Sequence, residues 1–157
     1  MRPIDERQHP SRFFRMTSSW SLPYSRDVVF DALADADSYR LWWPQVREVR
    51  RLDETHGTAR LRALIPMALH ITLTQRVNDA VRGELRADLT GDLVGWTSWH
   101  IHGDNRTARA EFAQEAYLVK KGVPTWSVHA ARPILVANHR SMMWSGRRGL
   151  IRHLAGS

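Results

Sequence analysis

The chain has 157 residues, of which 43% are hydrophobic and 25% charged, a balance typical of one globular domain rather than of a disordered chain. Its net charge is +7, and all of its 23 basic residues except Lys120 and Lys121 are arginines that are spread along the sequence without the dense block of a nucleic-acid arm. The absence of cysteine excludes disulfides, thiol catalysis and thiolate metal ligands, so any chemistry must come from His, Asp, Glu, Arg or hydroxyl groups.

The apolar stretches, such as residues 63–69, are shorter than the roughly 20 residues that a membrane span requires. The first ten residues carry charges and lack the apolar segment of a secretory signal. We therefore expect a cytoplasmic protein, with a flexible segment over residues 1–11 and a single domain over residues 12–157.

Residues 13–22 alternate between apolar and polar side chains, which predicts a half-buried strand. Ser25 is placed to cap a short helix directly after this strand. A second short helix is predicted within residues 37–46, where Pro44 must end it. Either Asp37 or Ser38 is expected to cap this second helix.

Six further strands are predicted from alternation and from the short turns between them. Their approximate spans are 46–53, 58–65, 68–77, 82–90, 94–102 and 106–118. Turns this short favour hairpins, and hence an antiparallel sheet. Period two also places apolar side chains together on one face of the sheet. Among the residues of this apolar face are Leu61, Ala63, Leu69, Ile71, Leu73, Leu85, Ala87, Leu89, Trp99, Ala108, Ala110 and Phe112.

Residues 124–157 show no strand pattern and predict a short helix followed by a long one that begins near Pro133, since proline suits the first turn of a helix. The stripe expected to face the sheet comprises Leu135, His139, Met142, Gly146, Leu150 and His153. The opposite face is expected to carry Arg140, Trp144, Arg147, Arg148 and Arg152.

Gly146 and Gly149 lie on or beside the inner stripe of this long helix. Either they let the helix backbone approach the sheet closely, or they leave a void that a ligand can fill. Small inward residues on the sheet, such as Ala63 and Ala87, favour the void, because packed interiors tolerate few cavities.

Three segments of the chain resemble the START and pollen-allergen superfamily, also called SRPBCC, and within it bacterial proteins described as polyketide cyclase/dehydrase-like. These segments are DSYRLWWPQV at 37–46, GDLVGWTSW at 91–99 and RPILVANHRSMM at 132–143. The resemblance implies an α+β helix-grip fold, in which a curved antiparallel sheet of about seven strands wraps around a long C-terminal helix. It further implies a hydrophobic cavity between sheet and helix, but no shared catalytic triad.

Four residues are predicted to bind a ligand in this cavity, namely Trp43, Leu61, Ala63 and Ile71. Trp42 and Trp43 end the second short helix near one mouth of the cavity. One of them is expected to face the ligand and the other to wedge the helices against the sheet, and the sequence leaves open which does which.

His139 is the candidate catalytic residue, because an imidazole that faces an apolar cavity can orient a carbonyl group or transfer a proton. A histidine that is simply packed in the core is the alternative. Asn138 beside it and Gln114, which is predicted to point inward, would add hydrogen-bonding groups.

Other polar pairs suggest structural roles. His100 and His102 share one strand face, as zinc ligands can, but that face is predicted to be the outer one and lacks a third ligand nearby in the sequence. Asp35 and Asp37 are explained by turn and cap chemistry. We therefore predict no cofactor and no metal.

The sequence favours a carrier or sensor of a lipid, polyketide or isoprenoid-like molecule over an enzyme. One alternative is a cyclase or dehydratase that uses His139. Another is binding to a polyanion or a membrane surface through Arg140, Arg147, Arg148 and Arg152. No specific nucleic-acid partner is expected, and the oligomeric state is left open.

Overall fold

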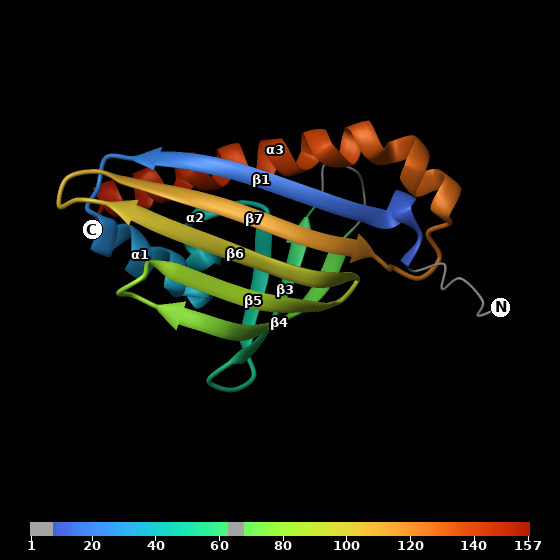
Figure 1. Ribbon diagram of the computed structural model, residues 1–157, viewed down its shortest axis with the longest axis horizontal. Helices are drawn as coiled ribbons and strands as arrows, with labels where there is room; N and C mark the ends of the chain where they lie inside the picture. The colour runs from blue at the N-terminus through green and yellow to red at the C-terminus, as the bar shows by residue number, and fades with distance from the viewer. Residues whose placement is uncertain (1–7, 63–67) are drawn as a thin grey trace.

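The structure is a computed structural model that describes residues 8–62 and 68–157 of the chain. It consists of one antiparallel sheet, two short helices that follow the first strand, and a long C-terminal helix (Figure 1). The elements in chain order are η2 (Pro10–Arg12), β1 (Phe13–Leu22), α1 (Arg26–Ala34), η3 (Ala36–Ser38), α2 (Tyr39–Trp42), β2 (Val46–Arg51), β3 (His56–Arg62), β4 (Ala68–Asp79), β5 (Glu84–Gly91), β6 (Leu93–Gly103), β7 (Ala108–Leu118) and α3 (Thr125–Ala155).

The seven strands are ordered β1-β7-β6-β5-β4-β3-β2, so that every strand from β2 to β7 pairs with its neighbour in sequence and β1 closes the row beside β7. Figure 1 shows α3 running along the sheet next to β1, with α1 and α2 near the end of the sheet where α3 finishes. The predicted α+β helix-grip architecture, with a seven-stranded antiparallel sheet and a long C-terminal helix, is confirmed.

Apolar and polar side chains alternate along β1, and this alternation determines which face of the strand is buried. Phe14, Trp20 and Leu22 are buried, whereas Arg15 and Ser21 on the opposite face are exposed. The strand pairs with β7 over its whole length without a bulge, so its inner side chains stay in line with those of β7.

The first short helix begins as predicted, because the Ser25 side-chain oxygen accepts a hydrogen bond from the backbone N–H of Val28 at 3.3 Å. Ser38, one of the two predicted caps of the second helix, occupies the N-cap position of α2, but its side chain makes no capping hydrogen bond there. The Ser38 hydroxyl instead donates to a carboxylate oxygen of Asp35 at 2.5 Å, and this bond stabilises the η3 turn. Side-chain bonds within a turn compete with capping in this way.

The predicted break between two C-terminal helices is also wrong, because α3 is one helix that contains Pro133. Proline removes one backbone hydrogen bond and bends a helix without having to end it. The first turns of α3 lie at an angle to the rest of the helix in Figure 1. Just before the proline, the Arg132 guanidinium donates to the backbone carbonyls of Ser11 and Phe13, which holds this part of the helix against the start of β1.

A second arginine attaches the beginning of α3 to the sheet. Arg12 is 6% exposed, and its guanidinium donates to the Thr125 hydroxyl at 2.9 Å, to the Leu118 carbonyl at 2.9 Å and to the Val123 carbonyl. A buried guanidinium requires such a full set of acceptors. Pro10 and Ser11, the last residues of the segment expected to be flexible, form a 3-10 turn together with Arg12.

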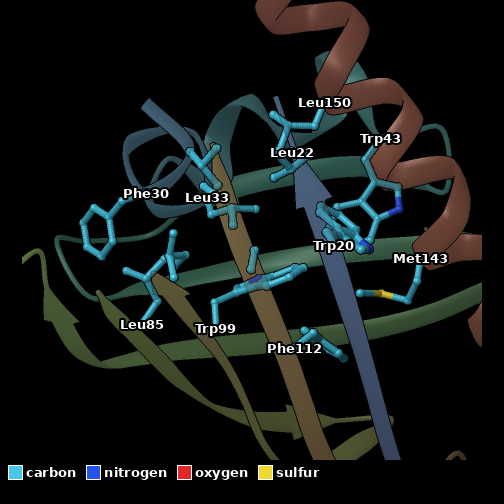
Figure 2. Packing of buried hydrophobic residues seen from close by; sticks show 14 of the residues in the cluster. Trp20, Leu22, Phe30, Leu33, Trp43, Leu85, Trp99, Phe112, Met143 and Leu150 are labelled. Carbon is cyan, nitrogen blue, oxygen red and sulfur yellow. The ribbon is translucent and has the colours of Figure 1, made fainter. Parts of the chain in front are cut away.

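Aromatic residues fill the end of the core next to α1 and α2 (Figure 2). Ring centroids are 4.7 Å apart for Trp20 and Trp99, 5.5 Å for Trp20 and Trp43, and 5.0 Å for Trp99 and Phe112. All four residues are buried. This cluster closes one end of the space between the sheet and α3, and the candidate site lies beyond it.

Candidate ligand-binding cavity

A cavity of about 340 Å³ lies between the inner face of the sheet, the region of η3 and α2, and the inner side of α3. This volume is at the lower end of the roughly 300–1,000 Å³ that is usual for small-molecule sites. The lining is mostly apolar and includes Leu61, Leu69, Ile71, Leu73 and Leu89. The cavity therefore suits a small molecule whose surface is largely apolar.

The sheet contributes one polar band to this lining. Five inward residues lie side by side across neighbouring strands, in the order Gln75, Ala87, Thr97, Gln114 and Met16. All five line the cavity. Two amides and one hydroxyl are thus placed at the same level of the sheet, where they can offer both donors and acceptors to a guest.

Apolar residues border this band on both sides. The row that follows contains Leu73, Leu89, Ala116 and Phe14, which are cross-strand neighbours apart from the Gly95 between Leu89 and Ala116. On the other side lie the aromatic rings of the core cluster. A bound molecule would therefore meet polar groups near the middle of the cavity and apolar surface toward both ends.

Thr97 is the most informative member of the band. Its hydroxyl oxygen is buried and has no hydrogen-bond partner among the residues that the structure describes. An unpaired buried hydroxyl costs about 1–3 kcal/mol, so a partner inside the cavity would stabilise this arrangement. Thr97 faces Gln114 directly across β6 and β7.

His139 approaches the cavity from α3. Its ring lies over Phe112 with a centroid distance of 5.6 Å, and it lines the cavity together with Asn138, Met142 and Met143. Burial lowers the pKa of His139 from 6.5 to about 4. The imidazole is therefore neutral at pH 7 and presents one donor and one acceptor nitrogen.

Tyr39 also lines the cavity, but its hydroxyl is occupied. It donates to the backbone carbonyl of Leu33 at 2.5 Å. Burial raises the pKa of this phenol well above its usual value. Tyr39 thus stays protonated and serves to hold α2 against the end of α1.

Charged residues line one rim of the cavity, between η3 and the turn that joins β2 to β3. Arg51 pairs with Asp37 at 2.8 Å. One oxygen of Asp53 accepts hydrogen bonds from the backbone N–H groups of Thr55 and His56 and contacts the His56 ring at 2.9 Å. The Thr55 and His56 bonds lower the pKa of Asp53 to about 2. This polar rim is exposed and marks a candidate entrance.

Three of the four residues predicted to bind a ligand line the cavity: Trp43, Leu61 and Ile71. The fourth, Ala63, lies outside the described residues. Of the two tryptophans, Trp43 lines the cavity, whereas Trp42 does not line it and stacks on the Trp43 ring with a centroid distance of 5.4 Å. The Trp43 indole N–H donates to the Met142 carbonyl at 2.9 Å, which fixes the ring at the cavity wall. Ligand binding by these residues stays a prediction.

The two helix glycines serve close approach and do not create the void. A Cβ on Gly149 would lie 1.7 Å from the Trp42 carbonyl oxygen, and one on Gly146 would lie 2.5 Å from the Trp43 ring. The partner of these glycines is α2 rather than the sheet. The space for a guest lies further along α3, where small sheet residues such as Ala59, Ala87 and Ala116 line the cavity.

Several other sequence predictions are settled by position. His153 is exposed, because it lies in the last turn of α3 beyond the buried part of the stripe. His100 and His102 are exposed with ring centroids 5.9 Å apart, and the part of the chain that the structure describes contains no group of three side chains that could hold a metal. Asp35 and Asp37 bind Ser38 and Arg51 respectively, so they do not form a carboxylate pair.

Gln75 and Thr97 were missed as candidate site residues. Thr97 lies two residues before Trp99 in β6, so period two alone places both on the inner face. The alternation of side chains along β6 was therefore the signal that could have identified Thr97. The same signal was weaker for Gln75, because a bulge shifts the register of β4 directly after it.

Comparison with known proteins shows the family. Residues 22–132 match the sequence profile of the family described as "Polyketide cyclase / dehydrase and lipid transport". The match covers more than half of the chain, and the protein belongs to this family. No curated protein matches the sequence significantly.

Solved structures with the same fold include three that cover most of this chain. The Zhui aromatase/cyclase from a Streptomyces species has a TM-score of 0.76 at 13% identity, with 90% of this chain and 93% of that chain covered. A conserved protein from Geobacillus kaustophilus has a TM-score of 0.76 at 10% identity, covering 92% and 97%. A START superfamily protein from Mycobacterium smegmatis has a TM-score of 0.67 at 12% identity, covering 89% and 98%. At such identities, the similarity shows the fold alone.

Within the described residues, no helix is both long and apolar enough to span a membrane. Although α3 has 31 residues, its arginines and histidines interrupt every apolar stretch.

Proposed function

We propose that this protein binds a small, largely apolar molecule that carries a polar group near its middle, and acts as a carrier or sensor of that molecule. Lipids, polyketides and isoprenoid-like compounds fit this description. The observation that carries the proposal is the cavity of about 340 Å³, in which apolar residues border a polar band on the sheet.

The polar band explains how such a site would select its ligand. A guest with a carbonyl or hydroxyl group at the level of Thr97 and Gln114 would complete the hydrogen bonding of the buried hydroxyl. A purely apolar guest of the same shape would leave that group unpaired. Sites that hydrogen-bond their ligand discriminate against analogues that lack the bonding group far better than apolar pockets discriminate by size.

The relatives are consistent with this class of ligand. The family description joins lipid transport with polyketide cyclisation, and the similar structures include both an aromatase/cyclase and a START protein. These names describe those proteins, and they support a hydrophobic ligand for this one without naming it.

Binding is favoured over catalysis by the state of His139. A histidine with a pKa of about 4 is a weak base at neutral pH, because effective proton transfer needs a pKa near the working pH. No carboxylate accompanies it, since the acidic side chains that line the described cavity belong to the rim around Asp37, Asp53 and Glu54. His139 is better suited to hydrogen bonding a ligand than to moving a proton.

The proposal is tested by filling the cavity from the sheet. Ala87 lines the cavity, and Ala113 lies on the opposite face of the same sheet, on β7. Both are replaced by Phe, and each protein is mixed with N-phenylnaphthylamine, an apolar dye that fluoresces when it leaves water. The wild type and Ala113→Phe are expected to bind the dye, and Ala87→Phe to lose at least tenfold in affinity. Equal binding by both variants would contradict the proposal, provided that thermal melting shows both to be folded.

Native mass spectrometry of the purified wild type addresses the natural ligand. A copurifying apolar molecule is expected, and Ala87→Phe should be free of it. A ligand retained by Ala87→Phe would place the binding site elsewhere.

A cyclase or dehydratase is the second candidate, and the imidazole in the cavity is the observation that favours it. Once a ligand is known, its conversion can be followed with the wild type and with His139→Gln. Conversion by the wild type and its loss in the variant, with ligand affinity retained, would establish the enzyme. Binding of the ligand without its conversion would support the carrier or sensor instead of the enzyme.

A further inference from the structure

The outer face of α3 combines exposed tryptophans with uncompensated positive charge. Trp126 is 74% exposed, Trp144 58% and Ile134 52%, which is unusual for side chains of this size in a folded domain. The helix contains five arginines and no acidic residue. Apolar and cationic groups therefore share a surface on which no carboxylate of the same helix can neutralise the charge.

Both tryptophans of α3 are exposed. Trp126 lies before Pro133 and Trp144 lies after it, so one stands on each side of the bend in the helix. Arg140, Arg148 and Arg152 are also exposed on α3. The Arg148 guanidinium lies 4.5 Å from the centroid of the Trp144 ring.

The other two arginines of α3 fix which side faces outward. Arg147 donates two hydrogen bonds to the Ser21 carbonyl, and Arg132 donates to the carbonyls of Ser11 and Phe13. These bonds hold α3 on β1 and engage Arg147 with the protein itself. Among the large side chains that α3 exposes are the two tryptophans, Ile134 and the three remaining arginines of the four expected from the sequence.

Indole rings and arginines together are the side chains that place a helix at the boundary between lipid headgroups and acyl chains. Indoles favour that boundary because one edge is polar and the ring is apolar. Arginines favour it where the headgroups are anionic. The net charge of +7 adds a long-range attraction to the same surface. A nucleic acid could bind the arginines, but binding to a nucleic acid would not explain why Ile134 is exposed between the two tryptophans.

We propose that the outer face of α3 docks onto an anionic lipid bilayer, with Trp126 and Trp144 inserted among the headgroups and Arg140, Arg148 and Arg152 paired with lipid phosphates. This inference goes beyond the cavity and does not depend on what the cavity binds. The same helix lines the cavity with its inner side, so docking would bring a lipid surface next to the ligand site.

Co-sedimentation with vesicles tests the proposal. The full chain is mixed with vesicles of phosphatidylcholine alone and of phosphatidylcholine with phosphatidylglycerol. Binding is expected only to the anionic vesicles and should weaken as salt is added. The triple variant of Arg140, Arg148 and Arg152 to Ala should lose about 100-fold in partitioning. Trp126→Ala/Trp144→Ala should lose about tenfold or more.

A matched triple variant controls for net charge. Arg47 and Arg50 of β2 and Arg106 of the β6–β7 turn are exposed and do not belong to α3, and their replacement by Ala removes the same charge. This variant should keep most of the binding, and an equal loss would overturn the proposal. No binding of the wild type to anionic vesicles would also overturn it.

Two further outcomes would replace the lipid surface with another partner. Tight, α3-dependent binding to a single-stranded oligonucleotide without binding to vesicles would make the face a nucleic-acid site. A dimer in light scattering that becomes a monomer in Trp126→Ala/Trp144→Ala, again without vesicle binding, would make the face an interface between two copies.

Discussion

Replacing Gly149 by Ala is expected to destabilise the protein, although the same change in an open helix stabilises it by about 1 kcal/mol. The new Cβ would lie 1.7 Å from the Trp42 carbonyl oxygen, whereas ordinary contact begins at 3.4 Å. Helices α2 and α3 would have to separate by the difference, about 1.7 Å. Backbone atoms cannot rotate away as a flexible side chain can. Overpacking of this kind costs typically 1–3 kcal/mol, occasionally more, so we expect a net loss of roughly 2 kcal/mol.

Urea unfolding followed by tryptophan fluorescence measures this loss as a lower midpoint at an unchanged slope. Gly156→Ala at the end of the same helix is the control, because its Cβ would meet its neighbours only at 3.8 Å. That variant should lie within about 0.5 kcal/mol of the wild type. A Gly149→Ala protein that is more stable than the wild type would refute the close packing of α2 on α3, and with it the placement of Trp43 at the cavity wall.

Two further predictions concern buried groups. The pKa of His139 is about 4 in the folded protein and 6.5 when exposed, so the unfolded chain binds the proton first as pH falls, and stability is lost between pH 6.5 and 4. This loss of stability amounts to roughly 3 kcal/mol. Urea unfolding at several pH values should show a smaller loss for His139→Gln, whereas His153→Gln, which changes an exposed side chain, should behave like the wild type. Identical pH profiles of His139→Gln and the wild type would contradict the burial of His139. Arg12→Met removes the buried guanidinium from three acceptors and should cost roughly 3–5 kcal/mol, whereas Arg15→Met breaks only a surface pair with Glu115 and should cost less than about 1 kcal/mol. Similar thermal midpoints for the two arginine variants would show that Arg12 does not anchor α3.

The strands were predictable because their signal is local. Side chains on a strand alternate between two faces, so the apolar positions of β1 and of β5 to β7 revealed both the strands and their inner faces. Short turns then required neighbouring strands to pair, which determines the order from β2 to β7. The pairing of β1 with β7 is the exception, because it joins the first strand of the chain to the last, about 90 residues later, and no local pattern reveals such a contact.

The C-terminal helix was predicted less well. Proline is unfavourable inside a helix by about 3 kcal/mol in isolation, and this predicts a break near Pro133. In the folded protein, Arg12 and Arg132 hold the first turns of α3 against β1 and the chain before it. Their contacts span more than 100 residues of sequence, so no local pattern could have shown them. Tertiary contacts override local propensity here.

The glycines illustrate the same limit within the candidate site. A glycine on the inner stripe of a helix is compatible with a void or with close packing, and the sequence does not say which element lies opposite. The structure places α2 there, because Trp43 donates to Met142 and thereby draws the two helices together.

By itself, the sequence determined the strands, the apolar face of the sheet and most of the inner stripe of the long helix, because these follow from periodicity along a single segment. Only the tertiary structure decided that Thr97 and Gln114 form a polar band within the cavity, that Trp126 is exposed on α3 as well as Trp144, and that Arg147 bonds to the Ser21 carbonyl. Those features depend on the register between strands and on the rotation of a helix about its axis, which contacts between distant residues set.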